Sequence, residues 1–206
     1  METKRSGGVT AFNPLDMENL ATSIASKLLQ TPAVTSTDIG DFRGAGVYAI
    51  YYRGSFPAYA PLVDEAAHDV AIYVGKAVPG GARKGIAVDV TARTKALRDR
   101  LREHVKSIGH TENLNIEDFR FRYLVVEPIW IPLGESAMIQ HSQPVWNTLV
   151  EGFGNHDPGT GRRAGVKSRW DTLHPGRPWA VNFPDRHETA GRIADEALEY
   201  LRSRLA

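Results

Sequence analysis

Two short apolar runs, each built around a tyrosine, limit the folds that are open to this chain of 206 residues. The first run reads GVYAIYY from residue 46, and the second reads AIYVGKA from residue 71. Because β-branched and aromatic residues favour strands, we predict strands at 47–52 and 70–74. Antiparallel pairing would bring the hydroxyls of Tyr48 and Tyr73 onto one face of a sheet. Buried phenols need hydrogen-bond partners, which a polar cleft supplies.

Helical periodicity covers much of the remaining chain, and residues 119–126 read as a third strand. Asn13 is expected to cap the first helix and Pro144 to end the third. Residues 151–180, rich in Gly, Pro, His and Arg, are expected to form an ordered loop region or a surface arm. The predicted fold class is α+β, a small and mostly antiparallel sheet flanked by helices, with loop insertions and terminal extensions. The predicted helices are 14–29, 91–108, 134–142 and 188 to the end.

The composition indicates one domain that folds without covalent links. A chain of this length buries roughly 70% of its unfolded surface, which is enough for a core of its own. The sequence has no cysteine, which excludes disulfides, thiolate metal sites and cysteine nucleophiles. The first residues, METKRSGGVTAFN, lack the apolar segment of a signal peptide, and no apolar run is long enough to span a bilayer. We therefore expect a soluble, cytoplasmic protein with no membrane partner.

Charge is unevenly distributed along the chain, although the formal net charge is only +1. Residues 83–106 carry eight Lys and Arg against three acidic residues, and residues 160–178 carry five against one. The segment between them, 107–159, carries two Arg against seven acidic residues. Two basic segments around an acidic one suit a surface that attracts phosphates, but ordinary solvated faces show the same pattern.

Four further residues have side chains that could serve a functional site, but each one is weak evidence when taken alone. Arg100 and His104 lie four residues apart in the predicted helix 91–108, so they share one face beside its apolar stripe. Such a pair can line a cleft, or it can pack an arginine stem while the histidine bonds a backbone carbonyl. Glu135 opens the third predicted helix, near its positive end, where a surface glutamate is also favourable. Asn147 follows Pro-Val-Trp, a position equally suited to an Asx turn.

In combination, these features resemble the GIY-YIG nuclease superfamily. The stretches GVY, IYVG, RLREH, GESAMI and PVWN occur in the order of its GIY strand, YIG strand, arginine helix, glutamate helix and late asparagine. Longer stretches, GAGVYAIYY, IYVGKAVP, EGFGNHDPGTGR and HPGRPWA, are similar to the type II restriction endonucleases that cut CCGCGG, the SacII isoschizomers. Valine replaces the central isoleucine of both tyrosine motifs. The tyrosines also lie farther apart than in the minimal superfamily domain, so 53–69 is expected to be an insertion that wraps DNA or contacts a second subunit.

The resemblance implies a division of the chain and a set of site residues. Residues 1–43 would form an arm and a helix, and residues 44–150 the nuclease core with its insertion at 53–69. Residues 151–206 would form a C-terminal loop region and helix of the same compact unit. Lys76, just after the second predicted strand, is expected to add positive charge to the cleft. The catalytic residues that the resemblance implies are Tyr48, Tyr73, Arg100, His104, Glu135 and Asn147.

The implied reaction is hydrolysis of duplex DNA phosphodiesters that depends on Mg²⁺. Because the set holds one carboxylate, we expect one Mg²⁺ per active site, with Glu135 as its protein ligand and oxygens of phosphate and water around it. Arg100 would bind the scissile phosphate. Tyr48 would orient or deprotonate the attacking water, and His104 would accept that proton.

Double-stranded DNA, a second copy of the chain and a cognate methyltransferase are the partners that the resemblance implies. A palindromic DNA site is normally met by a two-fold dimer, which puts one active site on each strand. Sequence reading is expected from the basic segments 79–98 and 160–178, because arginine pairs well with guanine in the major groove. The candidate DNA-binding residues are Arg83, Lys84, Arg93, Lys95, Arg98, Arg162, Arg163 and Lys167.

Three other interpretations stay open at this point. A GIY-YIG nuclease of the repair or mobile-element type would need a separate specificity module, for which little chain remains. A sequence-specific DNA-binding protein that does not cut would fail to digest a plasmid with Mg²⁺. A histidine-based metal enzyme is disfavoured, because the seven histidines show neither HxH nor HxxxH spacing.

Overall fold

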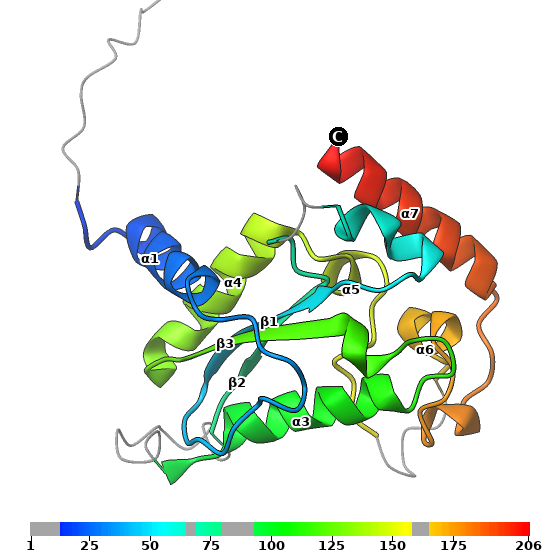
Figure 1. Cartoon of the computed structure of the whole chain (residues 1–206), viewed down its shortest axis with the longest axis horizontal. Helices are drawn as coiled ribbons and strands as arrows, with labels where there is room; N and C mark the ends of the chain where they lie inside the picture. The colour runs from blue at the N-terminus through cyan, green and yellow to red at the C-terminus, as the bar shows by residue number, and fades with distance from the viewer. Residues whose placement is uncertain (1–12, 65–68, 80–92, 158–164) are drawn as a thin grey trace, which may run out of the picture.

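A three-stranded antiparallel sheet forms the centre of the fold (Figure 1). The strands lie in the order β2-β1-β3, with β1 at Gly46–Tyr52, β2 at Tyr73–Ala77 and β3 at Phe119–Val125. The central strand β1 is buried along its whole length, which explains why its sequence is apolar on both faces. The predicted α+β class, with a small antiparallel sheet flanked by helices, is confirmed. The structure is a computed structural model, and it describes residues 13–64, 69–79, 93–157 and 165–206.

Alternate residues of β1 point to opposite faces of the sheet and join two separate cores. Val47, Ala49 and Tyr51 lie in the smaller core. Helices α1 (Met17–Leu29) and α4 (Ile131–Ser142) pack against each other and cover this face of the sheet (Figure 1). Val47 and Ala49 therefore face this helical layer. Their small size lets α4 pack close to β1, the strand that carries the first tyrosine motif.

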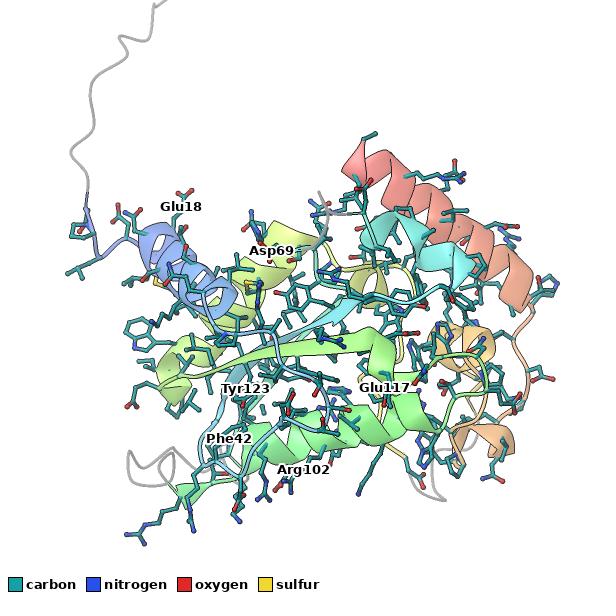
Figure 2. All side chains as sticks on the ribbon, viewed as in Figure 1. Glu18, Phe42, Asp69, Arg102, Glu117 and Tyr123 are labelled. Carbon is teal, nitrogen blue, oxygen red and sulfur yellow. The ribbon has the colours of Figure 1, made fainter. Side chains whose placement is uncertain are left out.

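The other face of β1 carries Tyr48, Ile50 and Tyr52 into the larger core. The apolar stripe of α3 packs there, and Figure 2 shows Arg102 on the outer side of that helix, where it is exposed. The amphipathic pattern predicted for this helix is thus the one that the fold uses. The helices on this side are α3 (Ala96–Gly109), α5 (Val145–Thr148), α6 (Arg169–Leu173) and α7 (Ala190–Leu205).

Helix α1 and strand β2 each begin three residues later than predicted. Helix α1 begins at Met17 rather than at residue 14, because the side-chain oxygen of Asn13 accepts a hydrogen bond from the backbone N–H of Leu15 and closes a turn first. Strand β2 begins at residue 73 rather than 70 and ends at Ala77 rather than at residue 74, because its pairing with β1 continues through Gly75.

Helix α4 begins earlier than predicted, and this changes the position of Glu135. A 3₁₀ turn at Pro128–Trp130 leads directly into the helix, whose first residue is Ile131 rather than residue 134. Glu135 therefore lies in the second turn and not at the positive end of the helix. The helix ends at Ser142, next to Gln143 with φ 38°, as Pro144 had indicated.

The C-terminal third and the insertion are more ordered than their composition predicts. Helix α6 lies within residues 151–180, and the hydroxyl of Ser168 caps its first turn. The described part of the insertion 53–69 contains a 3₁₀ helix at Pro57–Leu62 that packs against α7, with Tyr59 fully buried. This part belongs to the core instead of projecting from it. Within the described ranges, no helix is long and apolar enough to cross a membrane.

A buried chain of polar groups joins the insertion to the C-terminal third. The indole N–H of Trp146 donates to the hydroxyl of Tyr59 at 2.7 Å, and that hydroxyl lies 2.6 Å from Nε2 of His174. On its other side, Nδ1 of His174 lies 2.9 Å from the side-chain oxygen of Asn113. A neutral imidazole with its proton on Nδ1 satisfies every one of these contacts. Burial lowers the pKa of His174 to about 3, in agreement with that neutral form.

We predict that acidification destabilises the protein through His174. The unfolded imidazole takes up a proton below about pH 6.5, whereas the folded one stays neutral, so stability falls as the pH decreases. Between pH 7 and pH 5 the loss from this group alone is about 2 kcal/mol of unfolding free energy. Urea unfolding at pH 7, 6 and 5 measures it. The variant His174→Gln should show a weaker pH dependence, whereas exposed His187→Gln should keep the wild-type slope.

Candidate active site

Gly75 makes room for the phenol of Tyr48. The antiparallel register places Tyr48 of β1 directly opposite Gly75 of β2. A Cβ atom at this glycine would lie only 2.3 Å from the hydroxyl oxygen of Tyr48. The glycine of the second tyrosine motif is therefore required by close approach. It lets the phenol cross β2 and reach the neighbouring helix.

Helix α3 places His104 at the end of that phenol. The hydroxyl of Tyr48 lies 2.6 Å from Nε2 of His104, and both side chains are buried. Burial raises the pKa of Tyr48 well above its usual value and lowers the pKa of His104 well below its own. Both groups are therefore neutral, with the phenol donating to the imidazole. This is a proton donor and a proton acceptor already in hydrogen-bond contact.

Tyr73 and Phe153 complete the wall around His104. The Phe153 ring stacks on the imidazole with centroids 4.4 Å apart, and Tyr73 meets the same ring edge-on at 5.4 Å. The rings of Tyr48 and Tyr73 are 6.2 Å apart and tilted. Burial raises the pKa of Tyr73, and the charge of Arg100 opposes that rise. The two tyrosines predicted to share a face therefore do share one.

Arg100, one turn before His104 on α3, supplies a fixed positive charge to this cluster. One terminal nitrogen donates to the carbonyl of Gly154 at 2.7 Å. The other donates to Nε2 of His156 at 2.6 Å and to the carboxylate of Glu103 at 3.1 Å. After burial, the charge of Arg100 is the next cause of the lowered His104 pKa. Its guanidinium is thus positioned by acceptors that a phosphate group can replace.

Lys76 and Glu135 form the opposite side of the site. The ammonium of Lys76 on β2 lies 2.7 Å from Oε2 of Glu135 on α4, and their side chains are 41% and 20% exposed. The charge of Glu135 also reaches Tyr73, where it adds to the rise in pKa that burial causes. The pair therefore belongs to the same cluster as the tyrosines, although it comes from the other face of the sheet.

The donor atoms available here suit a hard cation that keeps most of its water. In the described ranges, no group of three or more His, Cys, Asp or Glu side chains could hold a metal ion. A cation at Glu135 would thus have fewer than three such protein ligands, with water and phosphate oxygens supplying the rest. Mg²⁺ binds in this way, through one or two carboxylates together with substrate phosphates. The residues present fit Mg²⁺ and do not fit a cage built from protein alone.

Asn147 holds the backbone of β2. Its side-chain oxygen accepts from the N–H of Val74 at 2.8 Å, and its amide nitrogen donates to the carbonyl of the same residue at 2.8 Å. Strand β2 lies at the edge of the described sheet, so these groups have no strand partner on that side. The asparagine takes the place of a neighbouring strand and fixes the segment between Tyr73 and Gly75.

Sequence reasoning assigned no role to the segment 152–156, which forms one wall of this site. Phe153 stacks on His104, while Gly154 and His156 accept from Arg100. A Cβ atom at Gly154 would lie 2.6 Å from the hydroxyl of Tyr73. The stretch EGFGNHDPGTGR, one of those similar to the endonucleases that cut CCGCGG, contains this segment, so the sequence did carry a signal that it matters. A hollow of about 530 Å³ opens beside it, next to Tyr73 and Asn147.

The candidate DNA-binding residues are only partly described. Lys95 lies 3.8 Å from Asp41, which also pairs with Arg98, and Arg93 is exposed nearby. Lys167 pairs with Asp185 at 2.6 Å. These cations lie at the surface, and each of the three paired ones already has an acidic partner. The remaining candidates lie outside the described residues: Arg83, Lys84, Arg162 and Arg163.

One arginine of the second basic segment cannot read DNA. Arg177 is only 1% exposed and forms two hydrogen bonds with the carboxylate of Asp171, at 2.6 and 2.7 Å. It also donates to the carbonyls of Gly152 and Phe153. The expectation that residues 160–178 form a DNA-reading surface is therefore wrong for this residue. Counting charges along a sequence does not reveal which of them are buried.

We predict that Asn147→Ala loosens β2. The variant loses two hydrogen bonds to Val74, which should cost about 2 kcal/mol of unfolding free energy and speed amide exchange at Val74. Urea unfolding and hydrogen exchange followed by NMR measure the two effects. Exposed Asn182→Ala serves as the control and should change neither quantity. Unchanged protection at Val74 in Asn147→Ala would contradict the clamp.

Comparison with known proteins agrees with this geometry. A family model described as the Eco29kI GIY-YIG domain matches residues 40–201, which is well over half of the chain. The match takes in the sheet, α3, α4 and most of the C-terminal third. No curated protein matches the chain. The resemblance to the GIY-YIG nucleases is thereby confirmed, and the chain belongs to the Eco29kI GIY-YIG domain family of restriction endonucleases.

Proposed function

We propose that the protein is a type II restriction endonuclease that uses Mg²⁺ to hydrolyse duplex DNA at a short GC-rich palindrome, CCGCGG. Family membership supports a nuclease that acts on DNA. The observation that carries the chemistry is the 2.6 Å contact between the Tyr48 hydroxyl and Nε2 of His104, beside the guanidinium of Arg100. The target sequence rests on the likeness of the wider stretches to the enzymes that cut CCGCGG.

The cluster divides the work of phosphodiester hydrolysis among its members. Arg100 would bind a non-bridging oxygen of the scissile phosphate in place of Glu103 and neutralise charge as it builds. Tyr73, at the edge of the same space, would donate a hydrogen bond to the phosphate or to the attacking water. Asn147 would hold Tyr73 in place through β2. These roles need no movement of the sheet.

Tyr48 and His104 would remove the proton from the attacking water. As the water oxygen bonds to phosphorus and the P–O3′ bond breaks, the water proton passes to the Tyr48 oxygen. The Tyr48 proton passes at the same time to Nε2 of His104. The imidazolium that results is disfavoured at rest by burial, so it forms only while negative charge on the phosphate lies nearby. After the leaving 3′ oxygen is protonated from solvent, the imidazolium returns its proton through the phenol.

Glu135 is the proposed ligand of Mg²⁺, which when bound supplies charge to a phosphate oxygen and to the leaving oxygen. The carboxylate is partly exposed and comes from α4, which covers the opposite face of the sheet from α3, the helix that carries Arg100. The two charged groups would therefore approach the scissile phosphate from different sides. Lys76 would add its charge to the same phosphate.

We propose that the enzyme works as a homodimer in the cytoplasm, alongside a methyltransferase that protects the same palindrome. A two-fold axis would match the symmetry of the site and bring one cluster to each strand. Lys95, Arg98 and Lys167 are surface cations that would exchange their acidic partners for DNA phosphates. A protein of the repair or mobile-element type would cut without this sequence preference, and a protein that only binds DNA would not cut.

We predict cleavage of plasmid DNA at CCGCGG with Mg²⁺ and no cleavage in EDTA. Glu135→Gln should abolish cutting but keep DNA binding in EDTA within about twofold of the wild type, because the basic surface survives while the metal ligand is lost. Digests and gel shifts on the same preparations measure both, with exposed Glu112→Gln as the control. A plasmid whose CCGCGG sites are altered should stay intact. Cutting by Glu135→Gln at the wild-type rate would rule out the proposed ligand.

We also predict strongly non-additive losses at Tyr48 and His104. Tyr48→Phe removes only the hydroxyl, and His104→Gln keeps a hydrogen-bonding group that cannot take a proton. Each should slow single-turnover cleavage by about 100-fold or more, and the double variant should be little slower than either. Rates at saturating enzyme remove binding from the comparison. If the two losses multiply, His104 does not act through Tyr48 and instead contacts the substrate independently.

A further inference from the structure

The carboxylate proposed to hold the metal already has a cation of its own. Oε2 of Glu135 lies 2.7 Å from the ammonium of Lys76, the distance of a charge-assisted hydrogen bond. The two residues come from different elements, α4 and β2, and both elements are fixed by packing of the smaller core. The contact is therefore set by the fold and does not depend on a chance meeting of two surface side chains.

We propose that Lys76 is the resident counter-ion of Glu135, and that a divalent cation enters the site by displacing it when a DNA phosphate arrives. This inference rests on the nuclease function and deepens it by assigning an order to the binding of metal and DNA. It follows from the donor set, because the described residues offer no group of three or more His, Cys, Asp or Glu side chains that could hold a metal, and the one carboxylate proposed as its ligand is engaged by Lys76.

Electrostatics gives the direction of the effect. In the free protein, a divalent cation at Glu135 has to break the ion pair and then lies beside the positive charge of Lys76, so its affinity is reduced. A phosphate in the cluster lowers both costs, that of breaking the ion pair and that of placing the metal beside the positive charge of Lys76. Its oxygens give the ammonium a new partner and add negative ligands for the metal. Metal and DNA should thus strengthen each other's binding. By thermodynamic linkage, DNA raises the metal affinity by the same factor as the metal raises the DNA affinity.

The position of the pair at the cluster fits this exchange. The charge of Glu135 contributes to the raised pKa of Tyr73, so the carboxylate lies within electrostatic reach of the tyrosine. Lys76 follows Gly75, over which the Tyr48 phenol crosses β2. An ammonium released from Glu135 therefore stays on the strand that the phenol crosses, one residue from the crossing. Displacement by the metal would therefore let the ammonium of Lys76 exchange the carboxylate of Glu135 for a DNA phosphate.

The test measures metal binding without DNA, so that cleavage plays no part. Mn²⁺ binding followed by electron paramagnetic resonance should be tighter in Lys76→Met than in the wild type, by roughly three- to tenfold for a half-exposed pair. Lys95→Met is the matched control, since that lysine is similarly exposed at 39% and pairs with Asp41, away from the site. Its Mn²⁺ affinity should equal that of the wild type. Glu135→Gln should lose the site.

A second measurement tests the coupling with DNA. The affinity of a CCGCGG duplex, followed by fluorescence anisotropy, should increase with Ca²⁺ in the wild type and increase by a smaller factor in Lys76→Met. Equal or weaker Mn²⁺ binding by Lys76→Met, with loss of binding in Glu135→Gln, would overturn the inference and leave the metal site standing. Mn²⁺ binding that Glu135→Gln does not reduce, with or without DNA, would overturn the metal site and the inference together.

Discussion

The buried ion pair between Arg177 and Asp171 holds the C-terminal third of the chain against the catalytic cluster. A buried charge pair is stable only when its remaining donors are also satisfied, and here Arg177 donates to the carbonyls of Gly152 and Phe153 as well. Trp170 and Trp179 each lie 4.5 Å from the guanidinium. Loss of either charged partner would leave the other buried and uncompensated, at a cost of about 3–5 kcal/mol.

From this anchored segment come the ring that stacks on His104 and the carbonyl that orients Arg100. The consequence for the site is electrostatic. Phe153 excludes water from the imidazole and so favours its neutral form. The cations at the edge of the cluster, Arg100 and Lys76, each have a carboxylate partner, Glu103 and Glu135. The free protein thus keeps a neutral pair at the centre of the cluster and balanced charges around it.

Sequence reasoning succeeded where one local pattern determines one outcome. The run of β-branched and aromatic residues in β1 is such a pattern, because it favours a strand by itself, and the strand is buried along its whole length. It failed where a contact distant in sequence decides. The glycine at position 75 is needed within β2 because the phenol of Tyr48 occupies the space that a side chain would take. Glu135 lies in the second turn of α4 because a 3₁₀ turn leads into the helix earlier than predicted. The charge count did not show that Arg177 is buried, because its partners, Asp171 of α6 and the carbonyls of Gly152 and Phe153, are brought together only by the fold.

The wall of segment 152–156 also bears on how this fold can change over time. Segment 152–156 lines the hollow beside Tyr73 and also carries Phe153, which stacks on the imidazole of His104. A change of side chain in this segment therefore alters the surroundings of that imidazole. Residues 44–150 do not complete the cluster alone, because Phe153, Gly154 and the Arg177 anchor follow them in the chain. Exchange of the following segment as a module would remove the ring from the imidazole and the carbonyl from Arg100. Changes that the cluster tolerates here therefore have to be small ones that leave the ion pair between Arg177 and Asp171 in place.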